Sequence, residues 1–345
     1  MKKISKRFNP FGFSLLLLSM FLFAGALPVS ALMHGGGGSS PSSCVTIAVG
    51  NDPHAIAIDS SGNVWVANGG NPANDWSGKV TELNSSGKIL GTTYAAGFDP
   101  QVIAIDSSGN VWVADSRSGF VTELTSSGKT VVGTYTVGFA PRGIAIDSSG
   151  NVWVANEASD SVTELNSSGK TVGTYAVGNS PWDIAIDSSG NVWVTNWGSN
   201  NVTELNSSGK TVGTYTVGSG PEGIAIDSSG NVWVTNEASG NVTELNSSCK
   251  TVGTYAVGRD PDAIAIDSSG NIWVANYHYD SGTVTELNSS GKTVGTYAVG
   301  TGPDAIAIDS SGNVWVTNFG SDNVTELIKA AKGPEYFPYS GPQWP

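Results

Sequence analysis

A unit of about 40 residues, repeated seven times, limits the folds open to this chain more than any other feature. Each copy contains the segment Ile-Ala-Ile-Asp, whose aspartate falls at Asp59, Asp106, Asp147, Asp187, Asp227, Asp267 and Asp309. The intervals between them are 47, 41, 40, 40, 40 and 42 residues. A regular period of this length indicates a repeat architecture, so the sequence predicts one repetitive domain rather than several unrelated ones.

Each unit predicts four short strands joined by tight turns. The strand segments read Ile-Ala-Ile, Val-Trp-Val, Val-Thr-Glu-Leu and Thr-Val-Gly-Thr-Tyr-x-Val, with Asp-Ser-Ser-Gly-Asn and Asn-Ser-Ser-Gly-Lys as the turns. Asp or Asn caps such turns with its side chain, and Gly supplies a positive φ. Four antiparallel strands per unit are typical of a propeller blade, so we predict an all-β, seven-bladed β-propeller. A Trp at one place in every unit predicts packing between blades.

The two ends of the repeat region predict how the ring closes. The seventh unit lacks its fourth strand, because Leu327 runs into Ile328-Lys-Ala-Ala-Lys. The missing copy occurs at the other end, where residues 46–53 match residues 174–181. We therefore predict an N-terminal outer strand that completes the last blade, with residues 46–49 pairing to residues 324–327. Such closure leaves no open blade edge.

The chain begins with the features of a secretory signal peptide. A basic start precedes an apolar stretch over residues 11–26, and small residues end the segment at Ala31. We expect residues 1–31 to be removed and residues 32–43 to form a flexible Gly/Ser linker. Residues 44–327 would form the propeller, and residues 328–345 a tail rich in Pro and aromatic side chains. This predicts a secreted, periplasmic or cell-surface protein with no membrane span in the mature chain.

The net charge of −13 narrows the range of partners. A surface this acidic repels the phosphates of nucleic acids and anionic lipids, so we expect no nucleic acid partner. Cations or cationic partners are favoured instead.

The repeated segments carry a family resemblance. Ile-Asp-Ser-Ser-Gly-Asn-Val-Trp-Val-Ala-Asn resembles NHL-type repeats, and Val-Trp-Val-Thr-Asn followed by Val-Gly-Ser-Gly-Pro resembles YVTN-type propellers of secreted and surface-layer proteins. The same pattern is similar to the streptogramin (virginiamycin B) lyases. That resemblance implies a seven-bladed fold and an elimination that opens a cyclic depsipeptide with Mg²⁺. It covers residues 46–327 and is more specific for the fold than for the chemistry.

Two features bear on the enzyme hypothesis. The lyases often end the Trp-containing strand with an acidic residue, whereas this chain has Asn there in six units and Asp115 in one. The lyases also use histidines, and the chain has three, of which His54 is the candidate acid or base. Three hypotheses therefore stay open: a non-catalytic binding scaffold, a lyase-like or lactonase-like metal-dependent enzyme, and a structural surface-layer component.

Comparison of the seven units places their differences on one face. The turns within each unit barely vary, whereas the junction around Pro and the loop after the Trp-containing strand differ from unit to unit. In an antiparallel blade these two variable connections lie on the same side, and loops on a rigid scaffold commonly carry binding residues. The candidate residues for binding a small molecule, a glycan or a protein are Gln101, Arg142, Trp182, Asp183, Trp197, Tyr277, His278 and Tyr279.

Three successive units place an acid directly after Pro, at Glu222, Asp262 and Asp304. Carboxylates that converge near the channel mouth would suit Mg²⁺ or Ca²⁺, so these residues are the candidate metal ligands. Cys44 and Cys249 fall two blades apart, and we expect no disulfide between them.

Overall fold

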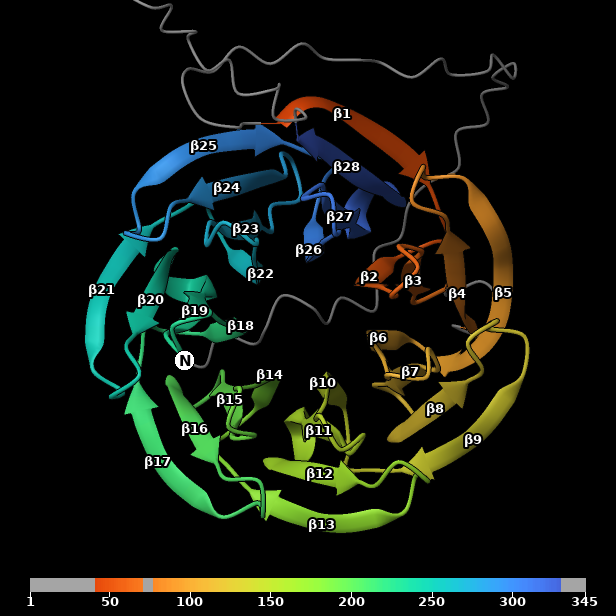
Figure 1. Cartoon of the computed structure of the whole chain (residues 1–345), viewed down its shortest axis with the longest axis horizontal. Helices are drawn as coiled ribbons and strands as arrows, with labels where there is room; N and C mark the ends of the chain where they lie inside the picture. The colour runs from red at the N-terminus through yellow and green to blue at the C-terminus, as the bar shows by residue number, and fades with distance from the viewer. Residues whose placement is uncertain (1–40, 71–76, 330–345) are drawn as a thin grey trace, which may run out of the picture.

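The computed structural model describes residues 41–70 and 77–329, which form seven four-stranded antiparallel sheets around a central axis (Figure 1). This arrangement confirms the predicted seven-bladed β-propeller. The expected signal peptide, most of the linker and the tail beyond residue 329 lie outside the described residues.

The two inner strands of each blade come from the most regular part of the unit. The innermost strands are β2 (Pro53–Ile58), β6 (Pro100–Ile105), β10 (Pro141–Ile146), β14 (Pro181–Ile186), β18 (Pro221–Ile226), β22 (Pro261–Ile266) and β26 (Pro303–Ile308). The second strands are β3 (Val64–Asn68), β7 (Val111–Asp115), β11 (Val152–Asn156), β15 (Val192–Asn196), β19 (Val232–Asn236), β23 (Ile272–Asn276) and β27 (Val314–Asn318). Every residue of the second strands is buried, because neighbouring blades cover both of their faces.

The two outer strands complete each blade. The third strands are β4 (Ser77–Leu83), β8 (Phe120–Leu124), β12 (Ser161–Leu165), β16 (Asn201–Leu205), β20 (Asn241–Leu245), β24 (Thr283–Leu287) and β28 (Asn323–Lys329). The outermost strands are β5 (Ile89–Phe98), β9 (Val131–Thr136), β13 (Thr171–Ala176), β17 (Thr211–Thr216), β21 (Thr251–Ala256), β25 (Thr293–Ala298) and β1 (Pro41–Ala48). Among the residues that the structure describes, short 3-10 turns follow three of the second strands, at Glu157–Ser159, Glu237–Ser239 and Phe319–Ser321.

The hydrophobic core lies between the blades. Trp153 of the third blade is fully buried against Val192, Val194 and Leu205 of the fourth. The same contact recurs around the ring, which confirms that the Trp side chains pack between blades. The indole of Trp153 stacks on Tyr175 at 5.6 Å between ring centroids, and its Nε1 donates to Asp147 at 3.3 Å. Asp147 of the invariant Asp-Ser-Ser-Gly-Asn turn therefore helps to fix the orientation of the buried indole.

Closure follows the predicted route but begins earlier in the chain. β1 pairs antiparallel with β28, so the first described strand lies beside the last (Figure 1). Ile47 lies opposite Val324, as Tyr175 lies opposite Val162 in the third blade, which confirms the match between the two segments. Residues 44–47, rather than 46–49, pair with residues 324–327, because the closing strand keeps the register of the third blade. Both strands also continue past the expected ends, to Pro41 and Lys329. Residues 41–43 are thus strand and not linker.

Both cysteines are free and lie in different blade interfaces. Cys249 occupies a turn position with φ of 60°, where the equivalent turns have Gly169, Gly209 and Gly291 at 73–74°. A Cβ at Gly209 would collide with the ring of Tyr175 in the preceding blade, so glycine suits this position.

Replacement of Cys249 by Gly is expected to raise the free energy of unfolding by about 0.5–1 kcal/mol. A left-handed conformation costs a non-glycine residue about 1–2 kcal/mol, and the greater freedom of glycine in the unfolded chain offsets part of the gain. Urea unfolding measures the change. Ser248→Gly, in the same exposed turn, is the control and should give no stabilisation; equal effects of both variants would contradict the prediction.

In the part of the chain that the structure describes, no helix is long and apolar enough to cross a membrane.

Candidate functional site

The variable ends of the blades surround a small cavity on the propeller axis. Before each innermost strand, the residue preceding Pro has a positive φ, as at Asp99 (64°) and Ser180 (52°), and this turns the chain sharply toward the axis. The residue after Pro then lies at the channel mouth. The cavity of about 110 Å³ is lined by His54, Ala55, Gln101, Val102, Arg142, Trp182, Asp183, Gly223, Asp262, Ala263, Asp304 and Ala305. This space suits a few waters or one head group, since sites for whole drug-sized ligands measure roughly 300–1,000 Å³.

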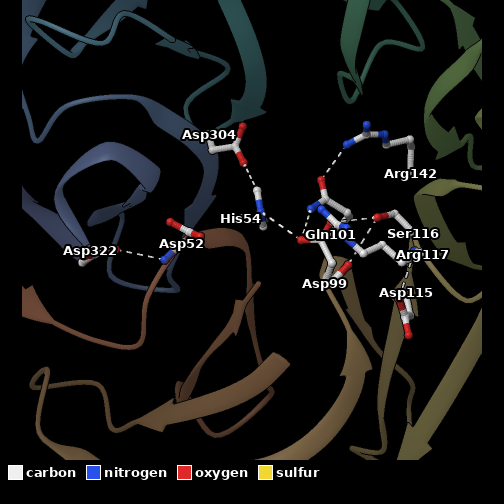
Figure 2. Close-up of polar contacts among 10 residues, drawn as sticks. All are labelled: Asp52, His54, Asp99, Gln101, Asp115, Ser116, Arg117, Arg142, Asp304 and Asp322. Carbon is white, nitrogen blue, oxygen red and sulfur yellow. Dashed lines mark hydrogen bonds and ion pairs between the residues drawn. The ribbon is translucent and has the colours of Figure 1, made fainter. Parts of the chain in front are cut away.

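His54 is held between two carboxylates from different blades. Its Nδ1 lies 2.8 Å from Asp304 Oδ2, across the closure seam, and its Nε2 lies 3.6 Å from Asp99 Oδ1 (Figure 2). Asp99 also accepts from Arg117 Nε at 3.1 Å and from the Ser116 hydroxyl at 3.2 Å. The first, second and last blades are thereby linked through His54.

These contacts change the pKa values of both partners. Burial alone would lower the pKa of His54, but Asp304 and then Asp99 raise it above its usual value. Burial would raise the pKa of Asp99, yet hydrogen bonds from His54 and Arg117 lower it to about 2. The imidazole is therefore stabilised as a cation that carries an orienting carboxylate on each side.

Asp304→Asn is expected to lower the pKa of His54, because the neutral amide removes the strongest stabilisation of the imidazolium. NMR titration of the imidazole measures the shift. In the wild type, His54 contributes to stability below the unfolded pKa of about 6.5, and this contribution disappears as pH rises through the folded pKa. An unchanged midpoint in Asp304→Asn would contradict the assignment, and Asp322→Asn on the same face is the control.

The network continues from Asp99 into the third blade. Gln101 donates to Asp99 at 3.0 Å and accepts from Arg142 at 2.6 Å (Figure 2). Arg142 Nε donates to Glu157 at 2.8 Å, and the guanidinium carbon lies 4.6 Å from the centroid of the Trp182 ring. This side of the mouth already contains a guanidinium held by a carboxylate and an indole, an arrangement typical of cation–π contacts.

The opposite side of the mouth is acidic. Glu222, Asp262 and Asp304 are 3%, 6% and 9% exposed, and each follows the Pro of its blade. Asp183 is the one acid at the second position after Pro. It accepts from the backbone N–H groups of Ile184 (2.8 Å) and Ile224 (3.2 Å), and burial raises its pKa to about 6 despite these bonds. The mouth therefore combines at least four carboxylates with one arginine and one histidine.

Aromatic side chains other than Trp182 flank the acidic side without lining the cavity itself. Phe319 lies 4.9 Å from His54 and 6.4 Å from Tyr277 between ring centroids, and Tyr277 meets Tyr279 edge-on at 5.2 Å. Trp197 Nε1 donates to Glu237 at 3.3 Å. His278 lies farther out, with Nε2 3.2 Å from Arg259. These rings form a partly exposed apolar surface beside the carboxylates.

The structure gives the candidate metal ligands a different setting from the one expected. Asp304 is hydrogen-bonded to His54, and among residues 41–70 and 77–329 no three His, Cys, Asp or Glu side chains are arranged to hold a metal ion. We therefore derive no chemistry through a three-carboxylate site. Mg²⁺ or Ca²⁺ binding by Glu222, Asp262 and Asp304 stays a prediction.

The Asn residues that end the second strands have a structural role. Asn156 is fully buried, accepts from Gly138 N at 2.9 Å and donates to the Thr163 hydroxyl at 3.0 Å. Asp115 takes the same place in the second blade, where it accepts from Phe98 N at 2.6 Å. These positions tie the loops of each blade together and do not reach the cavity.

Seven of the candidate residues named from the sequence meet at the cavity. They are His54, Gln101, Arg142, Trp182, Asp183, Asp262 and Asp304. Glu222, Trp197, Tyr277, His278 and Tyr279 lie outside its lining. Asp99 was not among the candidates, although it joins His54, Gln101 and Arg117. The sequence feature that could have identified it is an acid directly before Pro, at a position with a left-handed backbone.

Comparison with known proteins places the chain in a family. The family model described as the virginiamycin B lyase family matches residues 50–245. A search of curated protein sequences gives no match.

Several solved structures share the fold. A streptogramin B lyase is 18% identical with a TM-score of 0.74, and the match covers 83% of this chain and 97% of the other. A catalytically inactive variant of virginiamycin B lyase from Staphylococcus aureus with quinupristin is 20% identical with a TM-score of 0.73, covering 83% and 99%. Hydrazine synthase from Kuenenia stuttgartiensis is 18% identical with a TM-score of 0.71, covering 83% and 97%. At these identities the likeness concerns the fold.

Proposed function

This chain belongs to the virginiamycin B lyase family, and within that family we propose that it is a secreted binding protein for ligands that carry an organic cation. The ligand is a small molecule with an ammonium or guanidinium group, or a basic side chain of a peptide or protein. The observation that carries the proposal is the composition of the axial cavity, in which carboxylates and an indole converge around space for one head group.

The charge balance of the cavity favours a cation over an anion. Arg142 is engaged by Glu157, and His54 is engaged by Asp304 and Asp99, so each cation of the mouth already has its carboxylate. Asp183 and Asp262 line the other side of the cavity, and Glu222 is buried outside that lining, so the acids of this side outnumber its cations. A cation placed there gains from these carboxylates in a partly desolvated site, where charge interactions are stronger than in water.

The aromatic rings select for an organic rather than an inorganic cation. Arg142 over Trp182 shows that this mouth accommodates a guanidinium on an indole face. The partly exposed surface of Tyr277, Tyr279 and Phe319 lies on the acidic side, where the apolar part of a ligand would rest. Aromatic faces beside carboxylates are a common way to bind alkylated ammonium groups.

Isothermal titration with benzyltrimethylammonium tests the proposal, with benzyl alcohol as the neutral comparator. The cation should bind measurably more tightly, and Asp262→Asn should weaken it by roughly tenfold, or about 1.4 kcal/mol. Asp160→Asn, in an exposed loop on the same face, should leave the affinity unchanged. Equal binding of the alcohol, or equal effects of both variants, would refute the proposal.

One observation favours a second candidate function, that of a lyase. His54 with Asp304 on Nδ1 has the arrangement of an oriented acid–base imidazole, and it stands at the channel mouth. An elimination needs one group to remove a proton and one to protonate the leaving oxygen. Incubation with quinupristin separates the two functions, because a binding protein leaves the molecule intact whereas a lyase opens its ring. Elimination opens the ring with no change in mass, whereas hydrolysis adds one water. A His54-dependent product of unchanged mass would establish the lyase.

Secretion is part of the proposal and depends on residues 1–31. Expression of the full chain in a host with a general export pathway should yield exported protein that begins at Leu32. N-terminal sequencing measures the cleavage point, and protein retained in the cytoplasm with Met1 intact would contradict export.

A further inference from the structure

The blade that closes the ring lacks a hydrogen bond that five other blades share. In the second to sixth blades, a buried Glu of the third strand accepts from the hydroxyl of a Tyr on the outermost strand. The pairs are Glu123–Tyr135, Glu164–Tyr175, Glu204–Tyr215, Glu244–Tyr255 and Glu286–Tyr297, at 2.7–2.8 Å. Each Tyr ring also stacks on the Trp of its own blade.

In the closing blade the outermost strand is β1, which supplies no such hydroxyl. The register places Ile47 where the sister blades have Tyr, and Ile47 packs against Trp315 and beneath Gly87 of the first blade. Glu326 keeps its place opposite Trp315 on β27 and is 6% exposed. The isoleucine preserves the packing of the closure but not the polar contact of the carboxylate.

The charged groups around Glu326 do not compensate for the missing hydroxyl. Opposite it, β1 presents Val45, and the turn before β27 presents the carboxylate of Asp309. Lys329, three residues along β28, reaches away to Asp267 of the sixth blade and lies over Trp273. Lys88, in the turn above Ile47, is exposed to solvent. Burial and then repulsion from Asp309 raise the pKa of Glu326 to about 7.

We propose that Glu326 makes the closure of the propeller proton-dependent. β1 is held most tightly while Glu326 is neutral, and ionisation of Glu326 loosens β1 from β28. Release of β1 opens the side of Glu326 to water and relieves the cost of its charge. The sign follows from linkage: a carboxyl with a raised pKa in the closed state contributes stability at low pH and loses it as pH rises through that pKa.

Hydrogen–deuterium exchange of the backbone amides at pH 5.5 and pH 8 tests this, after correction for intrinsic exchange rates. With a pKa of about 7 closed and the ordinary 4.5 open, protection of β1 should fall by up to about thirtyfold more than protection of β13. β13 is the matched internal reference, since it is the equivalent strand of a blade with an intact Glu–Tyr pair. Equal pH dependence of both strands would overturn the proposal.

Two variants identify the cause. Glu326→Gln should remove the excess pH dependence of β1, whereas Glu164→Gln in the third blade should leave it in place. Ile47→Tyr should reduce the excess, because the hydroxyl would stabilise the ionised carboxylate and Gly87 leaves the same space that Gly209 leaves for Tyr175. If Glu326→Gln fails to fold, the result with Ile47→Tyr alone tests whether Glu326 causes the excess pH dependence. An undiminished excess in either folded variant would show that another group is responsible.

Discussion

A chain that starts at Asn51 is expected to lose several kcal/mol of folding stability relative to one that starts at Pro41. The shorter chain lacks β1, whose backbone pairs with β28 from Pro41 to Ala48. Each lost hydrogen bond costs about 0.5–1.5 kcal/mol net, and the contact of Ile47 with the core cluster around Trp315 is lost as well. The truncation also exposes the edge of β28, which favours association with other chains.

Thermal unfolding and light scattering measure these two effects. The chain that starts at Pro41 is the control, because it lacks residues 1–40 but keeps all of β1. Equal melting temperatures for the two chains would contradict closure by β1, as would the absence of any increase in aggregation.

Trp153→Ala is expected to lower the free energy of unfolding by about 3–5 kcal/mol, which is the range for large-to-alanine changes in protein cores. The indole is fully buried between the third and fourth blades, and its removal leaves a cavity that rigid strands cannot fill. It also leaves Asp147 without the Nε1 donor.

Trp153→Phe separates packing from hydrogen bonding. It keeps an aromatic ring on Tyr175 but removes the donor to Asp147, so its effect should be clearly smaller than that of alanine. Val172→Ala is the surface control, because Val172 is 57% exposed and such changes usually stay within about 0.5 kcal/mol. Urea unfolding measures all three, and a Trp153→Ala effect no larger than that of Val172→Ala would contradict a packing role.

The fold could be predicted because the sequence repeats the same four-strand unit seven times. One copy of Val-Trp-Val between two turns is ambiguous, but seven copies at a fixed period require seven equal interfaces. Closure was predictable from the unmatched segment before Pro53. The length of the pairing between β1 and β28 was not predictable. The extra pairing at Pro41 depends on Ile328 and Lys329, which continue β28 beyond the repeat.

The inner ring of the site was predictable for a similar reason. Once the innermost strand begins at Pro, the residue after Pro must lie near the axis, as His54 and Asp304 do. The polar contacts between side chains of neighbouring blades were not predictable, because they depend on the conformation of each side chain at the blade boundary. Asp99 lies 3.6 Å from His54 of the neighbouring blade, and Asp304 bonds to His54 from the last blade, contacts that no spacing in the sequence indicates.

The pairing of β1 with β28 also constrains the order in which the molecule can fold. During synthesis β1 emerges first, yet its partner is among the last described segments, so the contact joins nearly the full length of the chain. Contacts of this kind slow folding, because the entropy of closing the intervening loop is lost before the contact forms. The other six blades each consist of four consecutive strands, so they can form while β1 is still unpaired. Until closure, β1 and the edge of β28 stay unpaired, which exposes the chain to aggregation, and a chaperone that shields a single extended strand would protect it during that interval.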